Sequence, residues 1–134
     1  MPAQIEIDSG LLALPDPNAH GVRCFKGIPY GAPPIGPLRW RPPQPVKPWS
    51  GVRPTDTFGP NAPQRILFDD IDPFAIGVSE DCLYLNVWTP SKAEERLPVL
   101  FWIHGGGFAV GSGSEPRYDG AKLARHGIVV VTVN

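Results

Sequence analysis

Three consecutive glycines, Gly105–Gly107, stand between His104 and Phe108, directly after the apolar run Val99–Ile103. Three glycines at the end of a strand cost backbone entropy, so they are expected where the chain approaches a ligand closely or adopts positive φ. Either arrangement leaves backbone N–H groups free to point into one small volume. Donors held in this way stabilise the negative charge that develops on a carbonyl oxygen during acyl transfer, and the segment indicates that chemistry.

Nucleotide-binding loops also use glycines, but their spacing differs. A dinucleotide-binding loop needs G-x-G-x-x-G, and neither Gly105 nor Gly111 has a glycine five positions later. A phosphate-binding P-loop needs Gly-Lys-Ser/Thr, and no lysine occurs between Lys92 and Lys122. The alternative that stays open is a glycine-rich turn that joins a strand to a helix and has no catalytic role.

A second motif occupies residues 79–90, which read Ser-Glu-Asp-Cys-Leu-Tyr-Leu-Asn-Val-Trp-Thr-Pro. With Glu-Asp-Cys-Leu-Tyr-Leu-Asn the chain resembles the type-B carboxylesterases, which include bacterial para-nitrobenzyl esterases, liver carboxylesterases and cholinesterases. Nearly the whole chain is covered, because residues 22–30, 38–40, 48–51 and 129–134 are similar to further family segments. The His-Gly-Gly-Gly run also matches the oxyanion loop of lipases and esterases.

The resemblance implies an α/β fold, the N-terminal portion of an α/β-hydrolase with a mixed, mostly parallel sheet. Residues 1–134 would form the N-terminal part of a single domain that stops before the nucleophile elbow. The implied activity is hydrolysis of small-molecule carboxylic esters through an acyl-enzyme, with no metal or cofactor. No serine in the chain is flanked as G-x-S-x-G, so the triad is expected beyond Asn134, and the chain alone is expected to be inactive.

Two other functions are considered. Some relatives of this fold lack the serine and serve as binding or adhesion proteins, but the intact glycine triplet favours the esterase. A free-standing small binding domain is disfavoured, because its last strand would be an unprotected edge.

The resemblance also assigns roles to residues. Gly106 and Gly107 are expected to donate to the oxyanion, Gly105 and Phe108 to bind substrate, and His104 to shape the loop. His104 is not expected to be the catalytic base, because that histidine comes last in the chain of α/β-hydrolases.

Arg39 and Glu80 match a family ion pair, buried or half-buried, although two unrelated surface charges are the alternative. Cys82 is expected to be structural and to lack its usual disulfide partner, since Ala62 stands at the partner's position. Cys24 and Cys82 are therefore expected to be free thiols, which favours the cytoplasm of a bacterium.

Hydrophobic periodicity places the elements around these motifs. Strands are expected at residues 4–8, 22–28, 83–89, 98–104 and 128–133, a helix at 117–126 closed by Gly127, and a loop and a turn at 64–77 and 91–96. A strand, glycine loop, helix and strand in this order predict a parallel pair. Val99–Ile103 and residues 128–133 are apolar enough to be buried on both faces. Helical cover, and a strand beside residues 128–133, are expected from downstream sequence.

Eleven of the 18 prolines lie between Pro29 and Pro63. Proline removes a backbone donor, so this segment is expected to be irregular, packed on the core through Trp40, Trp49 and Phe58. A flexible linker is the alternative.

Composition limits the partners. The net charge of −1 gives no electrostatic reason to expect nucleic acid or an anionic membrane. No apolar run approaches the ~18 residues that span a bilayer, and residues 1–10 do not resemble a secretory signal.

Overall fold

The computed structural model describes residues 3–65, 77–90 and 96–134. Most of the expected loop at 64–77 and nearly all of the expected turn at 91–96 lie outside these residues. The strands are β1 (Gln4–Ile7), β2 (Gly10–Ala13), β3 (Val22–Pro29), β4 (Val52–Arg53), β5 (Tyr84–Pro90), β6 (Val99–Ile103) and β7 (Val129–Val133). The helical elements are the 3₁₀ turns η1 (Gly36–Leu38) and η2 (Pro116–Tyr118) and the short α1 (Ala121–Ala124).

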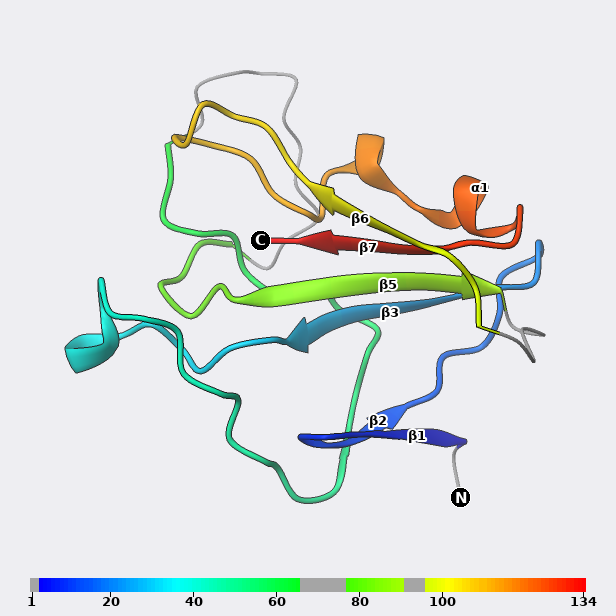
Figure 1. Cartoon of the computed structure of the whole chain (residues 1–134), viewed down its shortest axis with the longest axis horizontal. Coiled ribbons are helices and arrows are strands. Elements are labelled where there is room, and N and C mark those ends of the chain that lie inside the picture. Colours follow the sequence, from blue (N-terminus) through cyan, green and yellow to red (C-terminus); the bar gives the residue numbers. More distant parts are fainter. Residues whose placement is uncertain (1–2, 66–76, 91–95) are drawn as a thin grey trace.

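The main sheet has the order β3-β5-β7-β6 (Figure 1). β6 and β7 are parallel, in register from Val99↔Val129 to Ile103↔Val133, as the strand–loop–helix–strand order predicted. β3 and β7 both pair antiparallel with β5. The sheet is therefore mixed, and in the described part its parallel pair lies at one edge.

The position of β7 corrects one expectation. We expected the neighbour of residues 128–133 to come from downstream, but β7 already has β5 on one side and β6 on the other. The edge strands of the described sheet are β6 and β3. A strand may be inserted between two earlier strands by a crossover, and sequence order alone does not reveal this.

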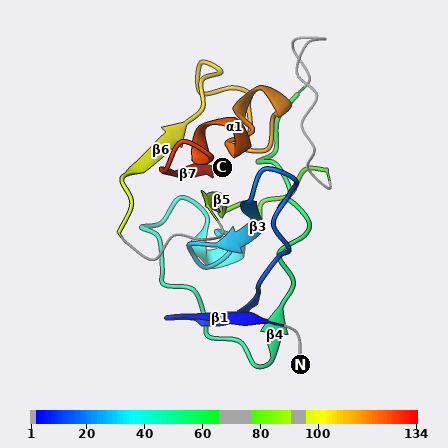
Figure 2. The same cartoon turned by 90° about the vertical axis from the view of Figure 1, so that its right-hand side faces the viewer.

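One face of the sheet is covered. Trp88 and Val130 form a core with Val22 and with Ala124 of α1, and all four side chains are almost inaccessible to solvent. Figure 2 shows α1 on this face. On the other face Val87, Val129 and Val131 are only half-buried.

β6 is exposed, which corrects the expectation that Val99–Ile103 is buried on both faces. The exposed fraction of its residues runs from 37% at Leu100 to 72% at Ile103. The reason is its place at the sheet edge, since α1 packs mainly over β3, β5 and β7. Among the described residues, the ring of Tyr118 contacts the ring of Trp102 on β6, and the two ring centroids lie 5.3 Å apart.

The expected helix at 117–126 is much shorter in the structure. Asp119 has an extended backbone, and its carboxylate accepts a hydrogen bond of 2.8 Å from the Ala121 N–H. Such a local bond competes with helix formation, so the segment divides into η2 and α1. Gly127, with φ of +86°, follows the last helical turn as predicted. No helix in residues 3–65, 77–90 and 96–134 is long and apolar enough to cross a membrane.

β1, β2 and β4 form a second, small sheet beside the main one (Figure 1). β1 was predicted, whereas β2 and β4 were not, because they are short and β4 lies within the proline-rich segment. The remainder of that segment is irregular, as expected.

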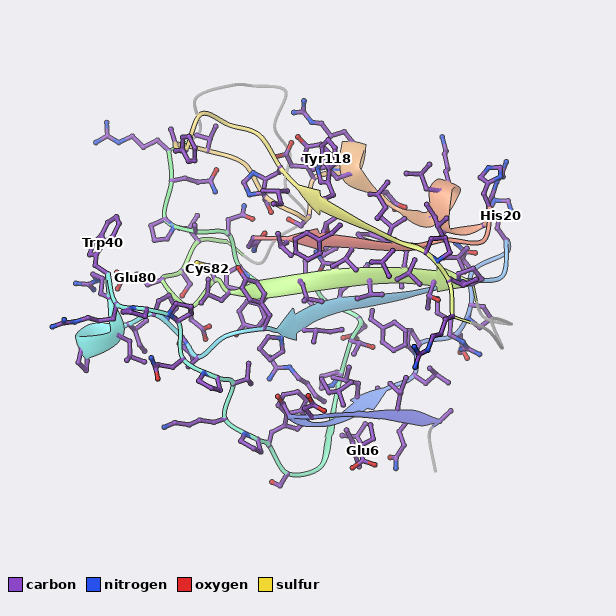
Figure 3. All side chains as sticks on the ribbon, in the orientation of Figure 1. Glu6, His20, Trp40, Glu80, Cys82 and Tyr118 are labelled. Carbon is purple, nitrogen blue, oxygen red and sulfur yellow. The ribbon has the colours of Figure 1, made fainter. Side chains whose placement is uncertain are left out.

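Two of the three predicted aromatic anchors pack as expected. Phe58 packs on the core, and the indole N–H of Trp49 donates to the Leu11 carbonyl oxygen at 3.0 Å. Trp40 is wrong as an anchor, because it is 97% exposed and points away from the sheet (Figure 3). Its left-handed backbone, with φ of +57°, lies next to η1.

Candidate functional site

The glycine triplet turns sharply after β6. Gly106 has φ of +122°, and its carbonyl oxygen accepts hydrogen bonds from the N–H groups of Ala109 and Val110, at 3.0 and 3.2 Å. A Cβ at Gly106 would lie 1.8 Å from the Val110 carbonyl oxygen. No other residue fits there without a change of the backbone, so the local fold requires glycine at this position.

The next two residues are also left-handed. Gly107 has φ of +61° and Phe108 has φ of +60°. A phenylalanine in this region costs about 1 kcal/mol or more, and such strain is typical of functional loops. The Phe108 side chain is fully exposed.

The N–H groups of Gly106 and Gly107 have no acceptor among the described residues. Both glycines are exposed at the surface of the loop. Two adjacent backbone donors are therefore available to a ligand without breaking a hydrogen bond of the described structure.

A hollow of about 470 Å³ adjoins the loop. Gly105, Gly107 and Phe108 line one side, and Gln64 and Asn134 line another. The hollow lies at the carboxyl ends of the parallel strands β6 and β7, which is where ligands bind in open α/β sheets. Of the predicted site residues on the glycine loop, His104, Gly105, Gly107 and Phe108 line this hollow, and Gly106 does not.

His104 is engaged within the loop. Its Nδ1–H donates to the Gly105 carbonyl oxygen at 2.7 Å. A Cβ at Gly111 would lie 2.5 Å from the same nitrogen, so the imidazole packs directly on the Gly111 backbone. These contacts fit the structural role expected of His104.

The second half of the loop is buried and polar. The N–H of Ser112 donates to the Glu115 carboxylate at 3.0 Å, and the N–H of Gly113 donates to Asn134 Oδ1 at 3.0 Å. The N–H of Ser114 donates to the hydroxyl of Ser112, also at 3.0 Å. Glu115 is 4% exposed, and its other oxygen lies 2.9 Å from Nε of Arg117. This network fixes the loop where it enters η2.

Asn86 connects that network to the sheet. Its Oδ1 accepts from the Gly27 N–H at 3.0 Å, and its Nδ2 donates to Thr132 Oγ1 at 3.0 Å. The Thr132 hydroxyl donates in turn to the Gly113 carbonyl oxygen at 2.7 Å. This role of Asn86 was not predicted from the sequence, although an asparagine among the apolar residues of a strand is a signal for a buried polar contact.

Two further carboxamides join the loop to residues 60–64. The side chain of Gln64 accepts from the Gly111 N–H at 2.7 Å and donates to the Gly111 carbonyl oxygen at 2.9 Å. The side chain of Asn134 donates to the Pro60 carbonyl oxygen at 2.9 Å. Neither residue was identified from the sequence, and no local pattern marks them.

Arg39 and Glu80 lie outside this hollow and form a bidentate ion pair. Nε and Nη2 of Arg39 lie 2.6 and 2.5 Å from the two carboxylate oxygens of Glu80. The side chains are 54% and 42% exposed, so the pair is more exposed than expected. The hydrogen bonds from Arg39 lower the pKa of the Glu80 carboxyl.

Both cysteines are free thiols in the structure. Burial raises the pKa of Cys24 to about 11, with opposing effects of Lys26, which lowers it, and Asp119, which raises it. Burial also raises the pKa of Cys82, whose side chain lies beside the start of β5 (Figure 3). Both thiols are therefore uncharged at neutral pH and poor nucleophiles.

The sequence of the chain is similar to the sequences of known esterases. It is 49% identical over 114 residues to the fumonisin B1 esterase of Sphingopyxis macrogoltabida, an alignment that covers 84% of the chain and 21% of that protein. It is 44% identical over 117 residues to the para-nitrobenzyl esterase of Bacillus subtilis, covering 86% of the chain and 24% of that esterase. The chain thus spans between a fifth and a quarter of the length of these relatives.

Solved structures of esterases also match the fold of the chain. A PNB esterase superposes with a TM-score of 0.90 at 41% identity, over 98% of the chain and 27% of that structure. A carboxylesterase of Geobacillus stearothermophilus gives a TM-score of 0.85 at 44% identity, over 98% of the chain and 26% of that structure. The fold is therefore the N-terminal part of an α/β-hydrolase. The model of the Carboxylesterase family matches residues 11–134, and the chain belongs to that family.

Proposed function

We propose that the chain is the N-terminal part of a serine carboxylesterase and supplies its oxyanion loop. The complete protein would hydrolyse small-molecule carboxylic esters through an acyl-enzyme. The observation that carries this proposal is the pair of N–H groups on Gly106 and Gly107, which have no acceptor among the described residues and belong to a loop that borders a hollow beyond two parallel strands.

The chemistry needs these donors when the ester carbonyl becomes tetrahedral. A serine oxygen attacks the carbonyl carbon, a histidine takes the serine proton, and negative charge moves onto the carbonyl oxygen. Gly106 and Gly107 would hold that oxygen by two N–H hydrogen bonds. Because the turn at Gly106 is already formed, the donors need no reorganisation as the charge develops.

The remaining catalytic groups would come from sequence outside residues 1–134. Serine, acidic residue and histidine follow one another along the chain in α/β-hydrolases, and no serine of this chain lies in G-x-S-x-G. We place Gly105 and Phe108 against the substrate, because both line the hollow. An exposed phenyl ring there favours an apolar, uncharged substrate group.

The test uses the complete gene product. We expect it to hydrolyse a para-nitrophenyl ester and to be inactivated by an organophosphate, which phosphorylates an activated serine as its leaving group departs. Residues 1–134 alone, prepared as the matched sample, should show neither property. A complete protein that folds but gives no turnover and no labelling would instead be a non-catalytic relative that binds a partner.

We further propose that the protein works in a reducing compartment, the bacterial cytoplasm. Cys82 is a free thiol and Ala62 offers it no partner, which supports this placement. Thiol titration of residues 1–134 under denaturing, non-reducing conditions should release the two thiols of Cys24 and Cys82. A value near zero would contradict the proposal.

A further inference from the structure

Gln64 makes an unusual contact with the glycine loop. Its carboxamide meets both backbone groups of one residue, as acceptor for the Gly111 N–H at 2.7 Å and as donor to the Gly111 carbonyl oxygen at 2.9 Å. The same nitrogen also donates to the Ala62 carbonyl oxygen at 3.2 Å, which fixes the side chain on its own segment. In Figure 1 the chain near residue 64 lies beside the tip of the loop that follows β6.

This contact reaches the triplet through the backbone. Gly111 follows Val110, whose N–H donates to the Gly106 carbonyl oxygen and whose own carbonyl lies against the Gly106 Cα. Gly111 also lies against the His104 ring and the Gly105 carbonyl oxygen, since a Cβ there would approach them to 2.5 and 2.6 Å. A shift of Gly111 must therefore move Gly105 and Gly106.

We propose that Gln64 is a positioning residue for the two free N–H groups. This role of Gln64 rests on the proposed function, because the two N–H groups matter for catalysis only if an oxyanion forms beside them. At neutral pH a carboxamide offers a donor and an acceptor side by side at this length, which is what the two groups of Gly111 require, whereas an ionised carboxylate offers acceptors alone. Gln64 acts through Gly111, so it shapes the transition state more than the binding of substrate.

The distinguishing variant is Gln64→Glu. An ionised glutamate of the same shape still accepts from the Gly111 N–H but places a second oxygen against the Gly111 carbonyl. Protonation restores a donor, so the contact should re-form as the pH falls. Gln64→Ala removes both hydrogen bonds at every pH.

We expect Gln64→Glu to lower kcat about tenfold at neutral pH, less than the ~10²–10³ that follows loss of an oxyanion donor, with KM within about threefold. The ratio of variant to wild-type kcat should rise from about pH 8 to about pH 5, as the introduced carboxyl is protonated. Gln64→Ala should show a loss that does not recover. The matched control is Gln44→Glu, since among the described residues the exposed Gln44 side chain bonds only to the Pro42 carbonyl oxygen.

A kcat for Gln64→Glu equal to wild type, or a ratio that does not change with pH, would overturn the proposal. An increase in KM at unchanged kcat would assign Gln64 to substrate contact instead. If the wild-type protein hydrolyses no ester, the proposed function fails separately. Hydrogen exchange of the Ala109 and Val110 N–H groups, which bond to the Gly106 carbonyl oxygen, then tests the positioning role of Gln64: faster exchange in Gln64→Ala than in wild type supports it, and equal exchange refutes it.

Discussion

The two halves of the segment between β6 and η2 are both rich in glycine, but they differ in burial and in hydrogen bonding. Residues 105–109 are exposed, whereas residues 110–115 are buried. In the second half, four consecutive N–H groups, from Gly111 to Ser114, donate to side-chain acceptors of Gln64, Glu115, Asn134 and Ser112. In the first half, the N–H groups of Gly106 and Gly107 have no acceptor among the described residues.

The difference separates support from function. A buried N–H without a partner costs free energy, so the second half needs acceptors for its donors, and side chains supply four of them. An exposed N–H can bond to water and exchange it for a ligand. The rigid half holds the open half in place, which is the arrangement that a preorganised donor site requires.

The sharpest test of this division is Gly106→Ala in the complete protein. The new Cβ would lie 1.8 Å from the Val110 carbonyl oxygen, so the turn must open and redirect the N–H groups. We expect kcat to fall by ~10²–10³, with a small change in KM. Steady-state kinetics on a para-nitrophenyl ester measures it.

Gly51→Ala is the control for this variant. Gly51 also has positive φ, +77°, but no atom lies within 4 Å of a Cβ there. Gly51→Ala therefore adds the backbone strain of a left-handed alanine but no steric clash of the new Cβ. Equal losses of kcat in the two variants would mean that strain alone accounts for the effect.

The buried half should affect stability instead of chemistry. Asn86→Leu leaves the buried Gly27 N–H without its acceptor, which costs about 1–3 kcal/mol of unfolding free energy. kcat should change far less than with Gly106→Ala. Chemical denaturation measures the loss, and Gln44→Leu serves as control because water can replace the exposed Gln44 carboxamide at the Pro42 carbonyl oxygen. A loss of kcat as large as that of Gly106→Ala, with unchanged unfolding free energy, would contradict the separation of a supporting half from a catalytic half.

The smallest effect is expected at the Arg39–Glu80 pair, which lies in solvent outside the loop. Glu80→Gln should lower the melting temperature slightly, and less at high salt, because exposed charges are screened. Since the folded pKa of Glu80 is lowered, the pair stabilises the fold above the ordinary glutamate pKa and loses this effect as the pH falls through the lowered value. Melting curves of Glu80→Gln that show the wild-type pH dependence would contradict this.

The sequence predicted those parts of the fold that depend on local pattern. β5, β6 and β7 lie within one residue of the predicted strands, since each is an apolar run bounded by proline, glycine or charge. The exposure of β6 and of Trp40 was not predictable, because burial depends on what packs above a residue. The spacing of hydrophobic residues predicts whether a segment forms a strand or a helix, but it does not predict which other segment covers it.

The candidate site shows the same limit. The glycine triplet was visible because three glycines in a row have few structural explanations. Its supports were not, since Gln64, Asn86 and Asn134 are far apart in sequence and meet Gly111 and Gly113 only after folding. Long-range side-chain contacts to backbone groups leave no local signature.

The position of a bound oxyanion mimic tests the role of Gly106 and Gly107. A crystal structure of the complete protein inactivated by an organophosphate would show the phosphoryl oxygen, which stands in for the oxyanion. We expect this oxygen to lie ~2.7–3.1 Å from the backbone nitrogens of both Gly106 and Gly107, with the positive φ angles of the loop unchanged. An oxygen bound elsewhere, or either N–H directed to a protein carbonyl, would contradict it.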